Sequence, residues 1–90
     1  MKTRALPGGC FLVGYDYGMG GIYQMVRARS SAEIESRFPE VVVFAEYPSW
    51  VLASDRREFE GEVLDIDAPG IEDSLFFRAV LADRNGGSRI

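Results

Sequence analysis

Near the start of the chain, two stretches with a strand-like pattern of apolar and polar positions flank a run of glycines. Residues 10–17 (CFLVGYDY) are rich in β-branched and aromatic side chains, and residues 22–29 (IYQMVRAR) alternate as a second strand would. The segment 18–21 (GMGG) adopts positive φ angles at low cost. This pattern predicts a β-hairpin. A phosphate-binding loop would need a helix directly after the glycines, and the alternation of residues 22–29 argues against one.

A short helix and an apolar strand are predicted next. Ser30 and Glu33 have the spacing of a capping box, and Pro39 ends a helix because the residue before a proline avoids the α-helical region. We therefore expect a helix over residues 31–38. Residues 41–46 (VVVFAE) are an apolar, β-branched run of strand length, which predicts the most buried strand of the sheet.

A second helix is predicted after the turn that follows this strand. Ser54 or Asp55 is a suitable N-cap, and Gly61 is a suitable left-handed stop. Ser49 is an alternative, earlier start that would draw Trp50 into the helix. Trp50 is also a candidate anchor of an interface, and core packing is its leading explanation.

The remaining pattern completes the predicted fold. Residues 62–67 alternate as a fourth strand, and residues 71–84 have the apolar spacing of the last and longest helix. The order of elements predicts an α+β fold with a four-stranded, mixed sheet, a leading β-hairpin and three helices packed mainly on one face. A chain of 90 residues is long enough for one domain and too short for two. We expect residues 1–90 to form that domain, with flexible ends at 1–9 and 85–90.

The composition limits the chemistry available to the chain. The sequence has no histidine, so the usual general base and the commonest metal ligand are missing, and neither a Ser-His-Asp nor a Cys-His system can be assembled. The single cysteine, Cys10, cannot close an intramolecular disulfide, and no apolar run approaches the ~20 residues that span a bilayer. These features favour a cytoplasmic, non-enzymatic domain with no cofactor and no membrane partner.

The net charge of −4 is unevenly distributed. Residues 1–30 carry four basic side chains and one carboxylate, whereas residues 31–73 carry twelve carboxylates and three arginines. An acidic middle repels phosphate backbones, so nucleic acid is a disfavoured partner. The same charge complements a basic protein, and residues 55–73 are the candidate binding segment of an immunity or antitoxin-like inhibitor.

Asp65 and Asp67 are the candidates for a metal site. On a strand their carboxylates share one face about 6.5–7 Å apart, and two such oxygen donors can hold Mg²⁺ or Mn²⁺. Aspartates before a Pro-Gly turn also commonly supply turn hydrogen bonds, and the chain offers no matching phosphate clamp. A small divalent-metal-assisted enzyme is therefore kept as an alternative, without a predicted resident metal.

Six side chains of the predicted hairpin form the candidate interaction face. They are Tyr15 and Tyr17, which share one face of their strand, and Tyr23, Met25, Arg27 and Arg29, which share one face of theirs. If the turn aligns the two sets, tyrosines grade into arginines, a combination that suits a protein partner or stacked single-stranded bases. Alternatively, the tyrosines pack between sheet and helix, and the arginines pair with the acidic middle.

The last predicted helix carries apolar side chains nearly all round. Phe77 with Leu81 and Phe76 with Val80 form two stripes in addition to the one that begins at Ile71. The surface helix of a lone domain needs only one apolar stripe. We therefore expect a homodimer with Phe76, Phe77, Val80 and Leu81 in its interface.

Several short motifs resemble small uncharacterised bacterial proteins. They are residues 27–34 (RARSSAEI), 38–40 (FPE) and 47–50 (YPSW) and the ending from Leu75 to Arg84, and together they span most of the chain after residue 20. The resemblance implies a bacterial cytosolic domain and carries over no catalytic residues.

The leading hypothesis is a non-enzymatic protein-interaction domain whose partner is another protein or a second copy of the chain. The immunity or antitoxin-like inhibitor and the metal-assisted enzyme are the alternatives.

Overall fold

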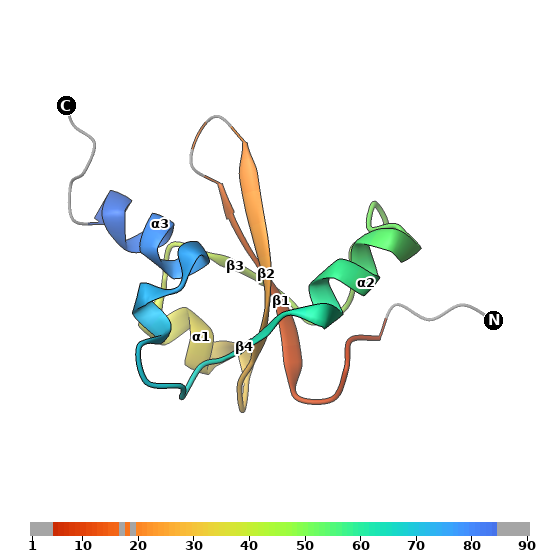
Figure 1. Cartoon of the computed structure of the whole chain (residues 1–90), viewed down its shortest axis with the longest axis horizontal. Helices are drawn as coiled ribbons and strands as arrows, with labels where there is room; N and C mark the ends of the chain where they lie inside the picture. The colour runs from red at the N-terminus through yellow and green to blue at the C-terminus, as the bar shows by residue number, and fades with distance from the viewer. Residues whose placement is uncertain (1–4, 17, 19, 85–90) are drawn as a thin grey trace.

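The computed structural model describes residues 5–16, 18 and 20–84. Over these residues the chain forms the predicted α+β fold, with a four-stranded mixed sheet and three α-helices (Figure 1). In chain order the elements are β1 (Cys10–Asp16), β2 (Gly21–Arg27), α1 (Ser31–Arg37), β3 (Val42–Phe44), α2 (Ala53–Gly61), β4 (Val63–Asp65), the 3₁₀ turn η1 (Ile71–Asp73) and α3 (Leu75–Arg84). Residues 1–4 and 85–90, predicted to be flexible, lie outside the described residues.

The β1–β2 hairpin forms the centre of the sheet, whose strand order is β3-β1-β2-β4. Strand β1 pairs antiparallel with β2, from Cys10 opposite Arg27 to Asp16 opposite Gly21, which confirms the predicted hairpin. Strand β3 pairs antiparallel with β1, and β4 pairs parallel with β2. A parallel pair needs a long connection, and α1, β3 and α2 provide it.

Helices lie on both faces of the sheet, with α1 and α3 on one face and α2 on the other (Figure 1). The alternation of side chains along β1 explains this division. Val13 points toward α1 and α3 and packs with Phe38 and Phe77, whereas Leu12 points toward α2 and packs with Tyr47. The helices therefore pack mainly on one face, as predicted, and α2 closes a second, smaller core.

The N-terminus of α1 has the predicted cap. The Ser30 hydroxyl accepts a hydrogen bond from the Glu33 N–H at 3.2 Å. The Glu33 carboxylate reaches back to the N–H of Arg29 at 2.9 Å, one residue before the expected partner. The first contact satisfies an N–H group that the start of a helix leaves without a partner.

Strand β3 departs from the prediction that residues 41–46 form the most buried strand. Of these residues Val42–Phe44 form the strand, at the edge of the sheet, while Glu46 makes an isolated antiparallel bridge with Ala5, and Val42 is 58 % exposed. An apolar run indicates strand formation but does not distinguish a central strand from an edge strand. Position in the sheet decides its burial.

Helix α2 begins and ends differently from the prediction. It starts at Ala53, where the Asp55 carboxylate accepts a hydrogen bond from the Leu52 N–H at 3.0 Å, so Asp55 supports the start from inside the helix. Gly61 is its last residue and has no positive φ, so it does not act as a left-handed stop.

The predicted helix over residues 71–84 is broken at Ser74. Its backbone is extended (φ −65°, ψ 153°), and its hydroxyl donates to the Ile71 carbonyl at 2.8 Å. Such side-chain-to-backbone hydrogen bonds compete with the helical pattern. The segment therefore folds as η1 followed by α3. Among the described residues, no helix has the length and apolar character needed to cross a membrane.

Candidate functional site

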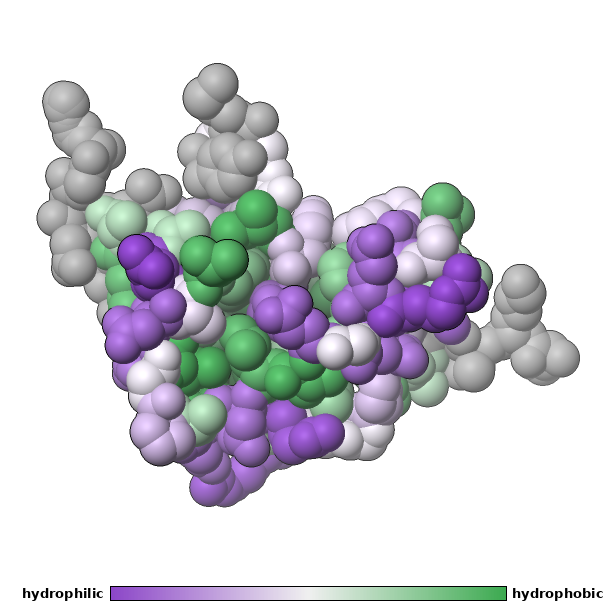
Figure 2. Space-filling view, in the orientation of Figure 1, coloured by the Kyte–Doolittle hydropathy of each residue, from purple (hydrophilic) through white to green (hydrophobic). Residues whose placement is uncertain are grey.

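Helix α2 covers only part of its face of the sheet. Leu12 and Met25, which lie opposite each other in β1 and β2, are fully buried there with Tyr47 and Val51. The end of the hairpin that carries the turn extends beyond α2 (Figure 1). The surface of α2 itself is mainly hydrophilic, as Figure 2 shows. Beyond α2, the sheet also presents apolar side chains on this side, among them Val42.

One row of three residues crosses the uncovered part of this face. Gly14 of β1 lies opposite Val42 of β3 on one side and Tyr23 of β2 on the other. Because Gly14 has no side chain, the Tyr23 ring leans over its backbone. A Cβ at Gly14 would lie 2.7 Å from Tyr23 Cε2 and 3.5 Å from Phe44 Cε2. A glycine inside a strand often marks such a close approach.

Trp50 packs against Tyr23 and extends this row. The two ring centroids lie 5.0 Å apart with planes tilted by 58°, a favourable geometry for aromatic pairs. A tight turn places Trp50 there, since Val51 N–H donates to the Pro48 carbonyl at 3.1 Å. Trp50 is 51 % exposed, so the expected core position is wrong. We call Gly14, Tyr23, Val42, Phe44 and Trp50 the aromatic face.

A hollow of about 280 Å³ opens beside the aromatic face. Tyr23 and Phe44 contribute to its walls, and Gly14 and Gly21 leave space where side chains would otherwise stand. Asp16 is the one charged residue among those that line it in the described part of the chain. Small-molecule sites commonly measure roughly 300–1,000 Å³, so this hollow suits a single side chain better than a large ligand.

The structure does not place the tyrosines of the predicted interaction face together. In the observed register Tyr15 lies opposite Ile22, and Gly14 lies opposite Tyr23. Tyr15 therefore points toward α1 and α3 and is buried, whereas Tyr23 is on the other face. A shift of one residue exchanges the two faces of a strand, which is why alternation alone did not settle the alignment. Tyr17 lies outside the described residues.

The other three members of the predicted face are also separated. Met25 is fully buried beneath α2. Arg27 is exposed at the end of β2, and Arg29 lies beyond that strand, next to α1. Of the six predicted residues, Tyr23 alone belongs to the aromatic face.

The apolar residues predicted to form a dimer interface pack within the chain. Phe76, Phe77 and Val80 are buried, and Leu81 is partly buried against the same core. Phe77 stacks on Phe38 with ring centroids 4.0 Å apart. The sheet, η1 and the end of α1 together surround α3, so several apolar stripes are covered without a second copy.

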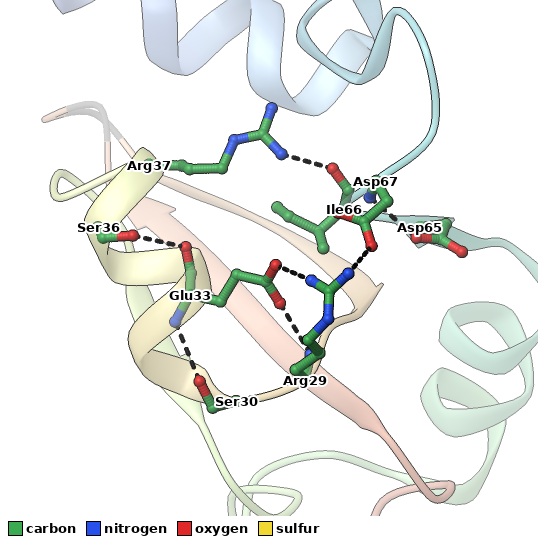
Figure 3. A network of polar contacts seen from close by, with 8 residues as sticks. All are labelled: Arg29, Ser30, Glu33, Ser36, Arg37, Asp65, Ile66 and Asp67. Carbon is green, nitrogen blue, oxygen red and sulfur yellow. Dashed lines mark hydrogen bonds and ion pairs between the residues drawn. The ribbon is translucent and has the colours of Figure 1, made fainter.

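Arg29 and the two candidate metal ligands belong to a polar network (Figure 3). The Arg29 guanidinium pairs with Asp67 at 2.8 Å and with Glu33. These carboxylates, Asp67 above all, raise the pKa of Arg29. An Asp65 carboxylate oxygen accepts a hydrogen bond from the Asp67 N–H at 2.9 Å. This is the kind of turn hydrogen bond that was the alternative to a metal site. The described residues contain no group of three or more acidic or cysteine side chains arranged to hold a metal.

Arg37 continues the same network from α1. Its guanidinium donates to the Ile66 carbonyl at 2.6 Å and pairs with Glu72 at 2.8 Å. The network thus ties α1 to the chain that follows β4 (Figure 3). The network also pairs carboxylates of the acidic residues 31–73 with arginines of the same chain. Pairing of the arginines with this acidic segment was the alternative to an interaction face.

A hydrogen bond between two ionisable side chains ties α2 to Tyr47, which packs against the sheet. The buried Tyr47 hydroxyl donates to the Glu60 carboxylate, and the Arg56 guanidinium lies 4.5 Å from the Tyr47 ring centroid. Burial, reinforced by the hydrogen bond to Glu60, raises the pKa of Tyr47. This contact holds the helix next to the aromatic face.

Comparison with known proteins yields no match. No family model, curated protein or solved structure is significantly similar to this chain.

Among the described residues that line the hollow, a carboxylate and tyrosines are present, but no nucleophile lies paired with a general base. The sequence signal for this face was Gly14, a glycine within a strand-like run. Val42 and Phe44 were missed because their contribution depends on strand order, which the pattern does not contain. Trp50 was named as a candidate anchor, but core packing was its leading explanation.

Proposed function

We propose that this protein is a protein-binding domain that holds a short segment of another protein on its aromatic face. The observation that carries the proposal is the Tyr23–Trp50 pair, whose rings pack on each other while 39 % and 51 % of the two residues stay exposed. Tyrosine and tryptophan are the residue types that contribute most at protein interfaces. Because the two rings already support each other, binding costs little side-chain entropy.

The size of the exposed surface favours a short segment. The free parts of Tyr23, Val42 and Trp50 amount to roughly 300 Å² of mostly apolar area, judged from typical side-chain areas. Stable interfaces between folded proteins bury about 800 Å² on each partner. A strand or loop of a few residues matches the aromatic face better than a folded domain does.

Trp50 makes the proposal directly testable, because it is the only tryptophan in the chain. We expect pools of synthetic octapeptides to change the fluorescence of Trp50 in a saturable way as they displace water from its ring. The affinity of the responding pools, measured by calorimetry, should fall about tenfold in Trp50→Ala, since hot-spot aromatics contribute on this scale.

Leu75→Ala is the matched control. Leu75 is 84 % exposed, but it begins α3 on the opposite face of the sheet. This variant should bind as the wild type does. The proposal fails if no pool alters Trp50 fluorescence, or if Leu75→Ala weakens binding as much as Trp50→Ala.

The two other functions considered from the sequence receive less support. Within residues 55–73, Asp67 and Glu72 pair with arginines of the same chain, which reduces the acidic surface left for a basic toxin. Asp65 and Asp67 are engaged by a backbone N–H and by Arg29. The aromatic face needs neither a metal nor a released carboxylate.

A further inference from the structure

We infer that the hollow beside the aromatic face receives a lysine or arginine side chain of the bound segment. This inference rests on the proposed function and specifies the partner as an extended, basic segment of another protein. It is carried by the juxtaposition of one carboxylate, two aromatic rings and a gap left by glycines.

Asp16 supplies the negative charge at the hollow. It shares a face with Gly14, two residues along β1, and one of its oxygens accepts a hydrogen bond from the Gly18 N–H at 2.8 Å. That contact fixes the carboxylate and leaves its second oxygen for another donor. Within the described residues, Asp16 has no ion-pair partner. A cation from outside the chain would therefore complete the charge balance of the hollow.

Tyr23 and Phe44 supply surfaces that suit the rest of such a side chain. Both rings line the hollow, and both lie close to the position that a Cβ at Gly14 would occupy. The aliphatic part of lysine or arginine packs on apolar surface, and its charged end is attracted to aromatic faces within about 6 Å. An acidic side chain would meet the Asp16 carboxylate instead. The net charge of −4 also favours the approach of basic segments.

The test compares octapeptide pools that differ only at one fixed central position, which is lysine, arginine, norleucine or glutamate. At about 50 mM salt, the lysine and arginine pools should bind wild-type protein about tenfold more tightly than the norleucine pool, and the glutamate pool should bind weakest. Norleucine keeps the aliphatic part of the lysine side chain and lacks its charged ammonium group. The difference between these two pools therefore isolates the cation.

Two variants with the same change in net charge locate the effect. Asp16→Asn retains an oxygen for the Gly18 N–H and should remove the preference for the basic pools. Glu35→Gln, on the exposed surface of α1 across the sheet, should retain that preference. Equal losses in the two variants would show that net charge alone attracts the peptides and would overturn the inference.

The outcomes also separate this inference from the proposed function. If norleucine and lysine pools bind equally and Trp50→Ala weakens both about tenfold, the aromatic face binds segments but the hollow has no cation preference. If no pool binds, the proposed function itself fails.

Discussion

Gly14 determines the shape of the aromatic face at the level of a single residue. A Cβ at this position would lie 2.7 Å from Tyr23 Cε2, closer than side chains tolerate. In Gly14→Ala we expect the Tyr23 ring to swing away from β1 and to leave Trp50 without its partner. The ring has solvent to move into, so unfolding free energy should change by about 1 kcal/mol or less, whereas Trp50 emission should shift.

Gly21→Ala is the control for this substitution. A Cβ there would meet Tyr23 atoms at 3.5 and 3.6 Å, which is ordinary contact, and Gly21 has no positive φ. Its Trp50 emission should match the wild type. Unchanged emission in Gly14→Ala would contradict the proposed support of Tyr23 by the glycine gap.

Tyr47 makes stability depend on pH in a defined direction. Burial and the hydrogen bond to Glu60 raise its pKa, so the folded chain keeps this proton at a pH where the unfolded chain has lost it. Above about pH 10 the unfolded state binds fewer protons than the folded state, and the free energy of unfolding therefore falls as the pH rises. Below that pH the contribution is fully present.

The Tyr47→Phe variant tests this linkage. Urea denaturation between about pH 9 and pH 11 should show a smaller loss of stability with pH in the variant than in the wild type. An unaltered pH dependence in Tyr47→Phe would show that another group controls it.

At the level of elements, α3 is a core helix. Phe77 has no exposed surface and stacks on Phe38, so Phe77→Ala should lower the free energy of unfolding by about 3–5 kcal/mol. Phe77→Asp would bury a charge without a partner and should leave the chain unfolded by far-UV circular dichroism. Leu75→Asp, in the same helix but exposed, should stay folded. A folded Phe77→Asp chain would favour the dimer interface expected from the sequence instead.

The helices and strands could be predicted from local sequence patterns, but the burial of each and the elements packed against it could not. Glycines between two strand-like runs predicted the hairpin, and Ser30 with Glu33 predicted the start of α1. The errors concern burial. Val42 is exposed because β3 is an edge strand, and Phe77 is buried because η1 and α1 enclose α3. Strand order and the approach of distant segments determine such positions.

The candidate site depended even more on long-range pairing. Tyr23 was named in the candidate interaction face and is 39 % exposed, whereas Tyr15, named in the same face, is buried. The register of the hairpin determines which tyrosine lies on the aromatic face, because it places Gly14, and not Tyr15, opposite Tyr23. Trp50 joins the face from a turn 27 residues further along the chain, and no periodicity connects it with β2.

For the whole molecule, the distribution of apolar surface predicts a monomer that binds small partners. The aromatic residues of α3 are enclosed, and the exposed surface around Tyr23, Val42 and Trp50 is well below the roughly 800 Å² that each partner contributes to a stable interface. Sedimentation equilibrium up to about 100 µM should therefore give the mass of one chain, since a dimer of typical affinity would assemble far below that concentration. Trp50→Ala should sediment identically. If the wild type dimerises and Trp50→Ala does not, the aromatic face binds a second copy of the chain, and the basic segment would have to compete with that copy for the same rings.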